Sequence, residues 1–352
     1  MADQTTHLAA MLPSVGGNLV ISKRDTPTPA AGEILIRNRA IAVNPIDWKR
    51  QAYGFMTPSF PLVLGADIAG EVVAIGPSVE GFKAGDHVVA LAHGLITGNA
   101  NNGAFQEFTS AQAKTTSKVP ETLSLTQAVT LPTAVGTAVM ILVESLGLPQ
   151  SALETANASA SSAPQSILIW GGASAVGNLL IQIAHKVGLF IYATASAKHH
   201  DKLRELGADV LFDYASGTVA EDILKASEEA GKPIEWAVGC ITKDETLAPV
   251  TAVLKGSTAK GAKKLVITSP LPASATPAEG IETTQVRGDE LWHRRSDLGE
   301  WLCWEALPAW LASGEIKPLE ARVVDGGLEG LQNAMDQLKQ GVVSGEKLVV
   351  EV

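Results

Sequence analysis

The segment Ser166-Ile167-Leu168-Ile169-Trp170-Gly171-Gly172-Ala173-Ser174-Ala175-Val176-Gly177 decides the fold of the second half of this chain. Its apolar start predicts a buried strand, and its glycines predict a tight turn into a helix over 175–187. The same rhythm repeats downstream, with strands expected at 190–194, 210–212, 234–238 and 264–268 and helices at 199–206, 218–230 and 243–254. Apolar strands that alternate with amphipathic helices predict a doubly wound parallel sheet, covered on both faces.

The glycine-bearing turn between the first strand and the first helix predicts a nucleotide site. Backbone N–H groups at a helix N-terminus bind phosphate, and glycine lets the chain approach the phosphate without a Cβ clash. A glycine-rich match is weak by itself, but this one lies inside a repeated strand–turn–helix pattern. The alternative is a purely structural turn. The residues expected to contact the nucleotide are Gly172, Ser174, Ala175, Val176 and Gly177.

The end of the second strand indicates which dinucleotide binds. An NAD site usually carries Asp or Glu about 20 residues after the glycines, where it accepts hydrogen bonds from the ribose. Here the sequence reads Ala195-Ser196-Ala197-Lys198-His199-His200, and the first carboxylate, Asp201, falls inside the next predicted helix. Because serine can donate to a 2′-phosphate and lysine can offset its charge, we predict NADPH. The residues expected around the phosphate are Ser196, Lys198, His199 and Tyr214. The alternative for Lys198 is a solvated surface lysine.

The first 130 residues follow a different pattern. Short β-type runs at Glu33–Arg39, Gly70–Ile75 and His87–Leu91 are separated by turns rich in Gly and Pro, which predicts a β-rich, barrel-like unit. The chain closes with a predicted helix, Leu328–Lys339, and a predicted strand, Lys347–Val352. At 352 residues the chain is too long for one core of the usual size, so two domains are expected.

Bulk composition excludes several classes of protein. The formal net charge of -10 leaves no basic stripe for nucleic acid or for an anionic membrane surface. No run of about 18 uncharged apolar residues appears, so we expect no membrane span, and we expect no secretory signal. The two cysteines, Cys240 and Cys303, exclude a disulfide scaffold and fit a reducing compartment, so we expect a cytoplasmic protein.

Three further segments call for an interpretation of their own. The low-complexity stretch Glu154–Gln165 is expected to be an exposed insertion. The loop Ser269–Gly280 follows a predicted strand at the ligand-binding edge of the sheet, so it either covers the site or is a plain surface loop. Trp301, Trp304 and Trp310 have helical spacing, which favours the buried side of a helix over a ligand box.

Taken together, these motifs resemble the medium-chain dehydrogenase/reductase superfamily. Within it, the chain is similar to the zinc-free quinone oxidoreductases and to the fungal trans-acting enoyl reductases of polyketide pathways. The resemblance covers nearly the whole chain, and its motifs are specific jointly rather than singly. They are Asn44-Pro45-Ile46-Asp47-Trp48-Lys49, Gly65-Ala66-Asp67, Ala69-Gly70-Glu71-Val72-Val73, Gly85-Asp86-His87-Val88, Gly103-Ala104-Phe105, Leu206-Gly207-Ala208-Asp209 and Ser344-Gly345-Glu346-Lys347.

The resemblance implies a fold and a domain division. The expected architecture is α/β, with a GroES-like β-rich N-terminal domain and a Rossmann domain. The GroES-like domain is expected over 1–130, completed by about 300–352, and the Rossmann NADPH-binding domain over 131–299. Zinc members carry Gly-His-Glu where this chain has Gly65-Ala66-Asp67, and a cysteine near Asn44. Since zinc prefers sulfur and imidazole ligands in a tetrahedral arrangement, we expect no metal.

The resemblance also implies which side chains line the nicotinamide and the substrate. Lys49 is the expected contact to a carbonyl or a carrier phosphate, and its alternative is a structural lysine paired with Asp47. Tyr53 is a candidate proton donor, and its alternative is a partly buried packing tyrosine. Thr137 is expected to bind the carboxamide region. The other implied cofactor contacts are Asn44, Pro45, Asp47, Trp48, Thr133, Val343 and Ser344.

A nicotinamide without a metal or an obvious nucleophile favours one kind of reaction. Hydride transfer to a C=C bond conjugated to a carbonyl, in an enone, quinone or enoyl thioester, needs only orientation and donors for the developing oxyanion. Three functions stay open: a free-standing enone or quinone reductase, a trans-acting enoyl reductase that serves a polyketide synthase, and a non-catalytic NADPH-binding structural or regulatory protein. The native substrate and the choice between monomer and homodimer are equally open.

Overall fold

The computed structural model describes residues 5–57, 59–155 and 166–352, with the side chain of Trp292 left out. The chain forms two compact units, one made of 1–133 with 289–352 and the other of 134–288. The chain thus leaves the first unit after Thr133 and returns to it at Asp289. Residues 156–165, which make up most of the expected insertion, lie outside the described residues.

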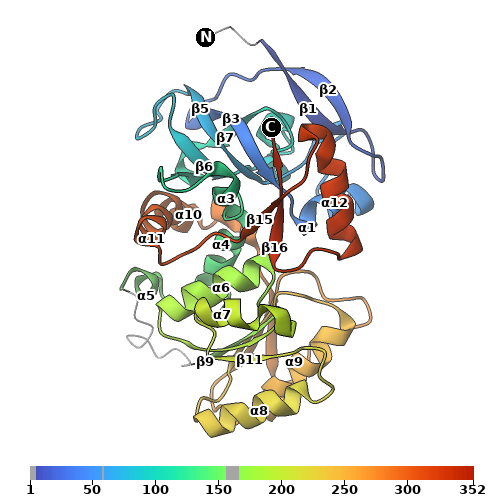
Figure 1. Ribbon diagram of the computed structural model, residues 1–352, viewed down its shortest axis with the longest axis vertical. Helices are drawn as coiled ribbons and strands as arrows, with labels where there is room; N and C mark the ends of the chain where they lie inside the picture. The colour runs from blue at the N-terminus through green and yellow to red at the C-terminus, as the bar shows by residue number, and fades with distance from the viewer. Residues whose placement is uncertain (1–4, 58, 156–165) are drawn as a thin grey trace. The chain divides into compact units, whose positions relative to one another are not determined.

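The first unit is built on a seven-stranded sheet in the order β15-β16-β3-β5-β6-β8, with β7 paired to β3 (Figure 1). All pairs in this sheet are antiparallel except β15 with β16. The last strand of the chain pairs with β3, where Val349 lies opposite Ala42. The C-terminal segment therefore completes a sheet that the N-terminal residues begin. The strands are β3 (Glu33–Ala42), β5 (Asp67–Ile75), β6 (His87–Leu91), β7 (Phe108–Gln112), β8 (Thr116–Lys118), β15 (Glu320–Val323) and β16 (Glu346–Glu351).

A smaller antiparallel sheet in the order β2-β1-β4 belongs to the same unit. Its strands are β1 (Thr6–Leu12), β2 (Val20–Asp25) and β4 (Leu62–Val63). Apolar residues of both sheets, including Leu12, Ile34 and Ile68, are fully buried in one cluster. The three predicted β-runs of this region are confirmed, and the barrel-like unit follows from burying one face of each sheet.

Six short helices belong to the first unit as the structure describes it. The helix α1 begins after Asn44, which forms a capping box with Asp47, and ends at Gly54 with φ 68°, a conformation that favours glycine. It packs against α12. The helices are α1 (Pro45–Tyr53), α2 (Gly94–Thr97), α3 (Leu125–Ala128), α10 (Ser296–Trp301), α11 (Leu307–Ser313) and α12 (Gly330–Gln340), with short 3-10 turns at Ala100–Asn102, Ala113–Thr115, Gly288–Trp292 and Gly327–Glu329.

The tryptophan stripe is only partly a core feature. Trp310 is 4% exposed and packs edge-on against Trp301, with 6.0 Å between the ring centroids. Trp304 is 41% exposed, so the expectation of a buried position is wrong for this residue. The π-helical turn Leu302–Ala306 interrupts the α-helical spacing on which that expectation rested. The indole N–H of Trp304 donates to the carbonyl of Ala113 at 3.0 Å.

The second unit is a six-stranded parallel sheet in the order β11-β10-β9-β12-β13-β14. This order is that of a doubly wound dinucleotide-binding fold, and it confirms the predicted Rossmann architecture. Its strands are β9 (Ser166–Trp170), β10 (Phe190–Thr194), β11 (Val210–Phe212), β12 (Trp236–Gly239), β13 (Lys263–Ile267) and β14 (Ile281–Gln285). Its helices are α4 (Pro132–Met140), which begins at the unit boundary, α5 (Gln150–Thr155), α6 (Ala175–Lys186), α7 (His200–Glu205), α8 (Val219–Ala230) and α9 (Asp244–Gly256), with a 3-10 turn at Ala197–His199.

In the second unit, the edge strand β14 was not predicted from the sequence. The strand β14 follows the loop Ser269–Gly280 and pairs in parallel with β13. Its sequence, Ile281-Glu282-Thr283-Thr284-Gln285, has one buried residue and no apolar run, because an edge strand packs on the sheet along one side only. The polar composition of β14 therefore gave no sequence signal for a strand.

One helical stretch, Leu125–Ser145, is long and apolar enough to cross a membrane by length and composition alone. It joins α3, α4 and the π-helical turn Ile141–Ser145. Of its most apolar window, 72% is buried inside the protein. That burial is typical of the core helix of a soluble protein, so the stretch is explained by the fold itself.

Candidate functional site

The turn after β9 builds a close junction between strand and helix. Ser174 caps α6: its hydroxyl donates to the carbonyl of Gly171 at 2.7 Å and accepts from the N–H of Gly177 at 3.1 Å. A Cβ on Gly177 would lie 2.4 Å from the Gly171 oxygen, so no larger residue fits at this position without moving the backbone. The sequence-predicted residues Gly172, Ser174 and Gly177 are thus brought together in one turn.

The same turn leaves donors at the start of α6. Ala175 and Val176 occupy the first two positions of that helix. Within the part of the chain that the structure describes, their backbone N–H groups have no hydrogen-bond acceptor. N–H groups at a helix N-terminus, together with the helix dipole, bind phosphate oxygens. The turn therefore fits the pyrophosphate of a dinucleotide.

The predicted phosphate-binding residues lie at the ends of β10 and β11. The hydroxyl oxygens of Ser196 and Tyr214 are 3.1 Å apart, and Lys198 is exposed two residues after Ser196. Burial and the nearby charges of Lys198 and His200 lower the pKa of His199. His200 is held away from this group because its Nε2 lies 3.0 Å from the carbonyl oxygen of Ala195.

The first carboxylate after β10 faces solvent. The side chain of Asp201 is 98% exposed, and its Oδ1 accepts from Arg204 at 2.9 Å within α7. An exposed i,i+3 ion pair of this kind contributes little to stability and leaves the carboxylate facing water. Asp201 therefore does not provide the ribose acceptor that the NAD pattern requires.

A second group of predicted residues meets in the first unit around Asp67. This carboxylate is fully buried at the start of β5. Its Oδ2 accepts from Nδ2 of Asn44 at 2.9 Å, and its Oδ1 accepts from the N–H of Thr133 at 2.8 Å and from the Thr133 hydroxyl at 2.6 Å. The ammonium of Lys347 completes the cluster. Four polar side chains thus share one enclosed position.

The sequence interpretation missed Asp67 and Lys347 as members of this site. Asp67 entered it only as a departure from the zinc pattern, and Lys347 only as part of a C-terminal motif. Each is a charge, of opposite sign, followed directly by buried apolar residues of its strand: Asp67-Ile68-Ala69 and Lys347-Leu348-Val349. Since buried charges in proteins are paired, that pattern was the available signal.

Asp47 is a second buried carboxylate beside the first. Its Oδ2 accepts from the N–H of Asn44 at 2.8 Å. Burial raises the pKa of Asp47 to about 7, and the charge of Asp67 adds to the rise, while the Asn44 N–H, Arg50 and Lys347 oppose it. The predicted cofactor contact is thus also a structural cap of α1 whose carboxyl group titrates near neutrality.

The exposed side of α1 carries the predicted catalytic pair Lys49 and Tyr53. Nζ of Lys49 lies 5.8 Å from the centroid of the Trp48 ring, and burial lowers the pKa of Lys49. The rings of Trp48 and Tyr53 are 6.1 Å apart. Tyr53 is 70% exposed, so its alternative as a partly buried packing residue is wrong. Pro45 occupies the first turn of the same helix.

The remaining predicted residues lie in two other places. Thr137 stands one helical turn after Thr133 in α4, and both are half-buried in a helix that is otherwise buried. A Cβ on Gly288 would lie 3.2 Å from the Thr137 hydroxyl oxygen. Val343 and Ser344 form the connection from α12 to β16, with Val343 half-buried and Ser344 exposed. The structure therefore presents the candidates as a group in each unit.

Comparison with known proteins decides the family. Residues 30–121 match the alcohol dehydrogenase GroES-like domain. The trans-enoyl reductase tndF of Aspergillus flavipes is 36% identical over 354 residues, which cover 98% of this chain and 98% of that protein. The chain belongs to the medium-chain dehydrogenase/reductase superfamily.

Two further proteins match this chain over nearly its whole length. The dehydrogenase azaJ of Aspergillus niger is 34% identical over 98% of this chain and 99% of its own. A solved alcohol dehydrogenase superfamily protein from Novosphingobium aromaticivorans has a TM-score of 0.77 and 25% identity, over 98% of this chain and 99% of that one. This dehydrogenase/reductase is therefore an oxidoreductase, and the nicotinamide cofactor of its superfamily fits the Gly171–Gly177 turn.

The described residues of this superfamily member can be searched for groups of metal-ligating side chains. Among the described residues, no group of three or more His, Cys, Asp and Glu side chains could hold a metal ion. Ala66 offers no ligand atom, and the carboxylate beside it, Asp67, is already paired with Lys347. The donor set at this position does not suit zinc.

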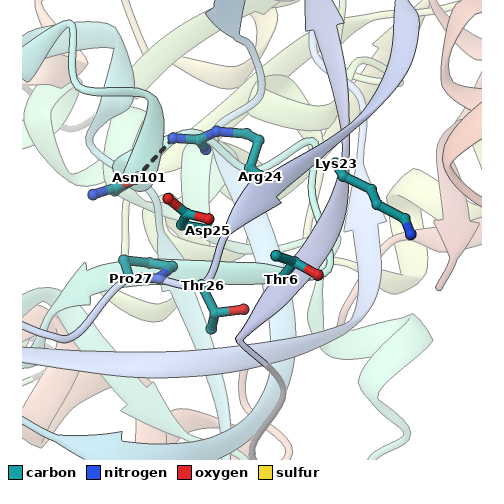
Figure 2. A pocket seen from close by; sticks show the side chains of 7 residues that line it. All are labelled: Thr6, Lys23, Arg24, Asp25, Thr26, Pro27 and Asn101. Atoms are coloured by element: carbon teal, nitrogen blue, oxygen red, sulfur yellow. Dashed lines mark hydrogen bonds between the residues drawn. The ribbon is translucent and has the colours of Figure 1, made fainter.

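A polar pocket of about 620 Å³ lies elsewhere in the first unit of this dehydrogenase/reductase (Figure 2). The guanidinium of Arg24 donates to Asn101 and Gln106, so its charge is directed into the protein framework. The lining residues are Thr6, Lys23, Arg24, Asp25, Thr26, Pro27 and Asn101, and none of them is a predicted site residue.

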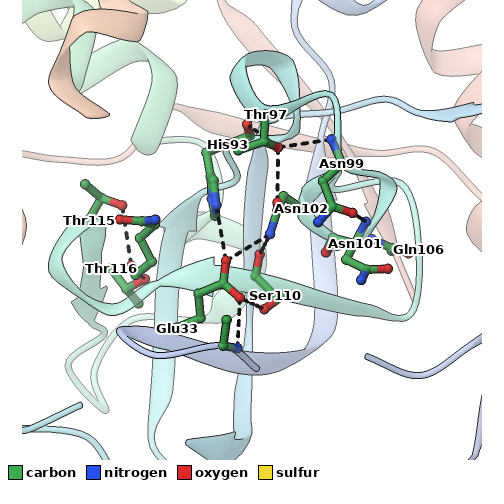
Figure 3. Close-up of polar contacts among 12 residues, drawn as sticks. Glu33, His93, Thr97, Asn99, Asn101, Asn102, Gln106, Ser110, Thr115 and Thr116 are labelled. Carbon is green, nitrogen blue, oxygen red and sulfur yellow. Dashed lines mark hydrogen bonds and ion pairs between the residues drawn. The ribbon is translucent and has the colours of Figure 1, made fainter. Parts of the chain in front are cut away.

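Glu33, the partly buried first residue of β3, faces the buried His93 (Figure 3). Nε2 of His93 is 3.5 Å from Oε1 of Glu33, which also receives Nδ2 of Asn102 at 3.3 Å. Among the described residues, Nδ1 of His93 has no hydrogen-bond partner. Burial lowers the pKa of His93, although Glu33 opposes the change. The pair belongs to the framework of the first unit rather than to the candidate site.

Proposed function

We propose that this chain is an NADPH-dependent reductase that transfers hydride to a C=C bond conjugated to a carbonyl, without a metal. The observation that carries the proposal is the 3.1 Å contact between the hydroxyls of Ser196 and Tyr214, with Lys198 two residues after Ser196 and no carboxylate between Ala195 and His200. The name of the relative from Aspergillus flavipes, a trans-enoyl reductase, supports the choice of acceptor.

The cofactor preference follows from charge. A 2′-phosphate brings up to two negative charges that need donors and a cation. Ser196 and Tyr214 supply two hydroxyl donors, and the exposed Lys198 supplies the cation. A neutral His199, whose pKa is lowered, adds a donor at the same loop without repelling Lys198. An NAD-type carboxylate in this place would repel the phosphate.

The remaining candidates divide the chemistry among themselves. NADPH supplies a hydride, and the acceptor's β-carbon receives it while charge grows on the carbonyl oxygen. We assign Lys49 as the cation that stabilises this oxygen and Tyr53 as the group that delivers a proton to the product. Thr137, with Thr133, Asn44, Val343 and Ser344, orients the nicotinamide and the substrate beside it. Pro45, Asp47 and Trp48 complete that contact.

In this proposal the cation that polarises the substrate's carbonyl oxygen is the side chain of Lys49 rather than a metal ion. Zinc members polarise an alcohol oxygen with a Lewis acid. Here Gly65-Ala66-Asp67 lacks the imidazole ligand, and Asn44 offers an amide where a thiolate would be needed. Oxidation of an alcohol therefore lacks the Lewis acid that zinc members supply, whereas reduction of an activated double bond needs only a correctly oriented hydride donor.

The acceptor distinguishes two forms of the proposal. A free-standing enzyme would reduce a diffusible enone or quinone in the cytoplasm, as a monomer or homodimer. A trans-acting enzyme would reduce an enoyl thioester held by the acyl carrier of a polyketide synthase. The relative's name favours the second form. A protein that binds NADPH without turnover is the alternative of another class.

One assay separates these functions. Purified protein is mixed with NADPH and, in turn, with an enone, a quinone and an enoyl thioester, free and carrier-bound, and absorbance of NADPH is followed. Turnover of the enone or quinone supports the free-standing reductase. Turnover restricted to the carrier-bound thioester supports the trans-acting enzyme. NADPH binding without any turnover would overturn the proposal in favour of the non-catalytic protein.

A further inference from the structure

The Asp67 carboxylate ties together segments that are far apart in the sequence. Asn44 immediately precedes α1, Thr133 stands in the first turn of α4, and both donate to Asp67. Lys347 comes from β16, 280 residues further along the chain, and donates to the same carboxylate and to the Thr130 carbonyl at 3.4 Å. One carboxylate therefore fixes the beginnings of two helices.

The charge of this carboxylate needs an internal cation. Asp67 has 0% and Lys347 4% of the side chain exposed, so water screens neither charge. A buried carboxylate is unfavourable unless it is paired and hydrogen-bonded. Lys347 also acts on Asp47, since its charge opposes the rise in the pKa of that neighbour. A single ammonium thus serves two buried carboxylates.

The two helices carry the groups assigned to the reaction. Lys49 lies five residues after Asn44 in α1, and Thr137 lies four residues after Thr133 in α4. Because a helix is stiff over one or two turns, a change at its first residue displaces side chains further along it. A displacement of about 1 Å at a reacting group can lower a rate roughly 100-fold.

We propose that Lys347 is a positioning residue for the reductase reaction: by fixing Asp67, it sets the starts of α1 and α4 and hence the places of Lys49 and Thr137. The inference rests on the proposed function, because that function gives Lys49 and Thr137 their roles. In this proposal Lys347 acts through Asp67 and the two residues that donate to it, Asn44 and Thr133.

The test compares Lys347→Met, which keeps the length of the side chain and removes the charge, with Lys347→Arg, which keeps the charge. The matched control is Lys339→Met, at an exposed lysine on α12. For Lys347→Met we expect kcat with the accepted substrate to fall roughly 100-fold. The Kd for NADPH should rise by a much smaller factor than kcat falls, because the Gly171–Gly177 turn belongs to the other unit. Lys347→Arg should restore much of kcat, and Lys339→Met should match the wild type.

Hydrogen exchange supplies a readout that does not depend on turnover. Peptides covering 44–53 and 130–140 should exchange faster in Lys347→Met, since the Thr133 N–H loses its fixed acceptor, while peptides covering 172–187 should not change. If the wild type reduces no acceptor, the proposed function fails, and exchange alone still decides whether Lys347 orders the two helix starts.

If Lys347→Met fails to fold, the double variant Asp67→Asn with Lys347→Met is tested in its place. It removes both charges together and leaves neither buried alone. We expect a folded protein with a lowered kcat. A folded double variant with wild-type kcat and wild-type exchange at 44–53 and 130–140 would overturn the inference, as would Lys347→Met with both properties intact.

Discussion

The hydroxyl oxygens of Ser196 and Tyr214 lie 3.1 Å apart, although the two residues follow different strands of the parallel sheet. Ser196 comes just after β10 and Tyr214 just after β11, and these strands are neighbours. Ligands of doubly wound folds bind at the carboxyl edge of the sheet. The pair therefore lies where the second strand of such a fold selects between phosphorylated and unphosphorylated nucleotide.

Replacing Lys198 with alanine should weaken NADPH and leave NADH nearly unchanged. The variant removes the cation facing the expected 2′-phosphate but no group that touches the ribose of NADH. A charge-assisted hydrogen bond contributes about 1.5–3 kcal/mol, which corresponds to a roughly 10- to 150-fold rise in Kd for NADPH. Fluorescence titration with each nucleotide measures this, with Lys202→Ala on the exposed side of α7 as the control. Equal losses for both nucleotides would refute the phosphate assignment.

Gly177→Ala should weaken nucleotide binding and destabilise the second unit. The new Cβ would lie 2.4 Å from the carbonyl oxygen of Gly171, so the turn and the start of α6 must separate. We expect Kd for either nucleotide to rise by about tenfold or more and Tm to fall by several degrees. Gly217→Ala, where a Cβ meets nothing within 4 Å, is the control for the substitution itself. Tight nucleotide binding by Gly177→Ala would contradict the close packing described for this turn.

The second unit was largely readable from the sequence because its elements depend on local patterns. The strands at 166–170, 190–194 and 210–212 coincide with β9, β10 and β11, since each is a short apolar run bounded by turn residues. The strand β14 was not readable, because its polar residues carry neither an apolar run nor an alternation.

The cluster around Asp67 could not be predicted from local sequence patterns. Its partners come from positions 44, 133 and 347, and only the pairing of β16 with β3 and of β3 with β5 brings them together. No periodicity relates residues that are separated by 280 positions. Tyr53 shows a different limit: a tyrosine near the end of a helix can face either way, and its 70% exposure depends on how α1 packs.

Asp47→Asn should make stability less dependent on pH between about 4 and 7. Burial raises the pKa of Asp47 to about 7 from an ordinary value of 3.8, so in this window the folded protein retains a proton that the unfolded chain has released. Stability therefore falls as the pH rises, by roughly 4 kcal/mol over the full window. Asparagine keeps the acceptor for the Asn44 N–H and cannot ionise. Urea unfolding at pH 5 and pH 8 should show a smaller difference for Asp47→Asn than for the wild type.

The control for that measurement is Asp325→Asn, at an exposed aspartate of the same unit. It should leave the pH dependence of unfolding as in the wild type. Equal slopes for the wild type and Asp47→Asn would show that the Asp47 carboxyl group has an ordinary pKa in the folded protein.

His93→Gln should remove an opposite pH dependence near pH 6. Burial lowers the pKa of His93 below 6.5, so the folded protein keeps the ring neutral while the unfolded chain takes up a proton as the pH falls through 6.5. The stability associated with the neutral ring is therefore complete above pH 6.5 and is lost below it. Glu33 does not interfere: burial raises its pKa, but the hydrogen bonds that it receives from Ser110, the Ala30 N–H and Asn102, together with the charge of His93, outweigh burial and lower its pKa below 4.5. As the pH is lowered from 7.5 to 5.5, the Tm of the wild type should fall more steeply than the Tm of His93→Gln. The control is His87→Gln, at an exposed histidine, and its Tm should follow that of the wild type. Parallel curves for all three proteins would mean that the buried His93 ring accepts a proton as readily as a solvated one.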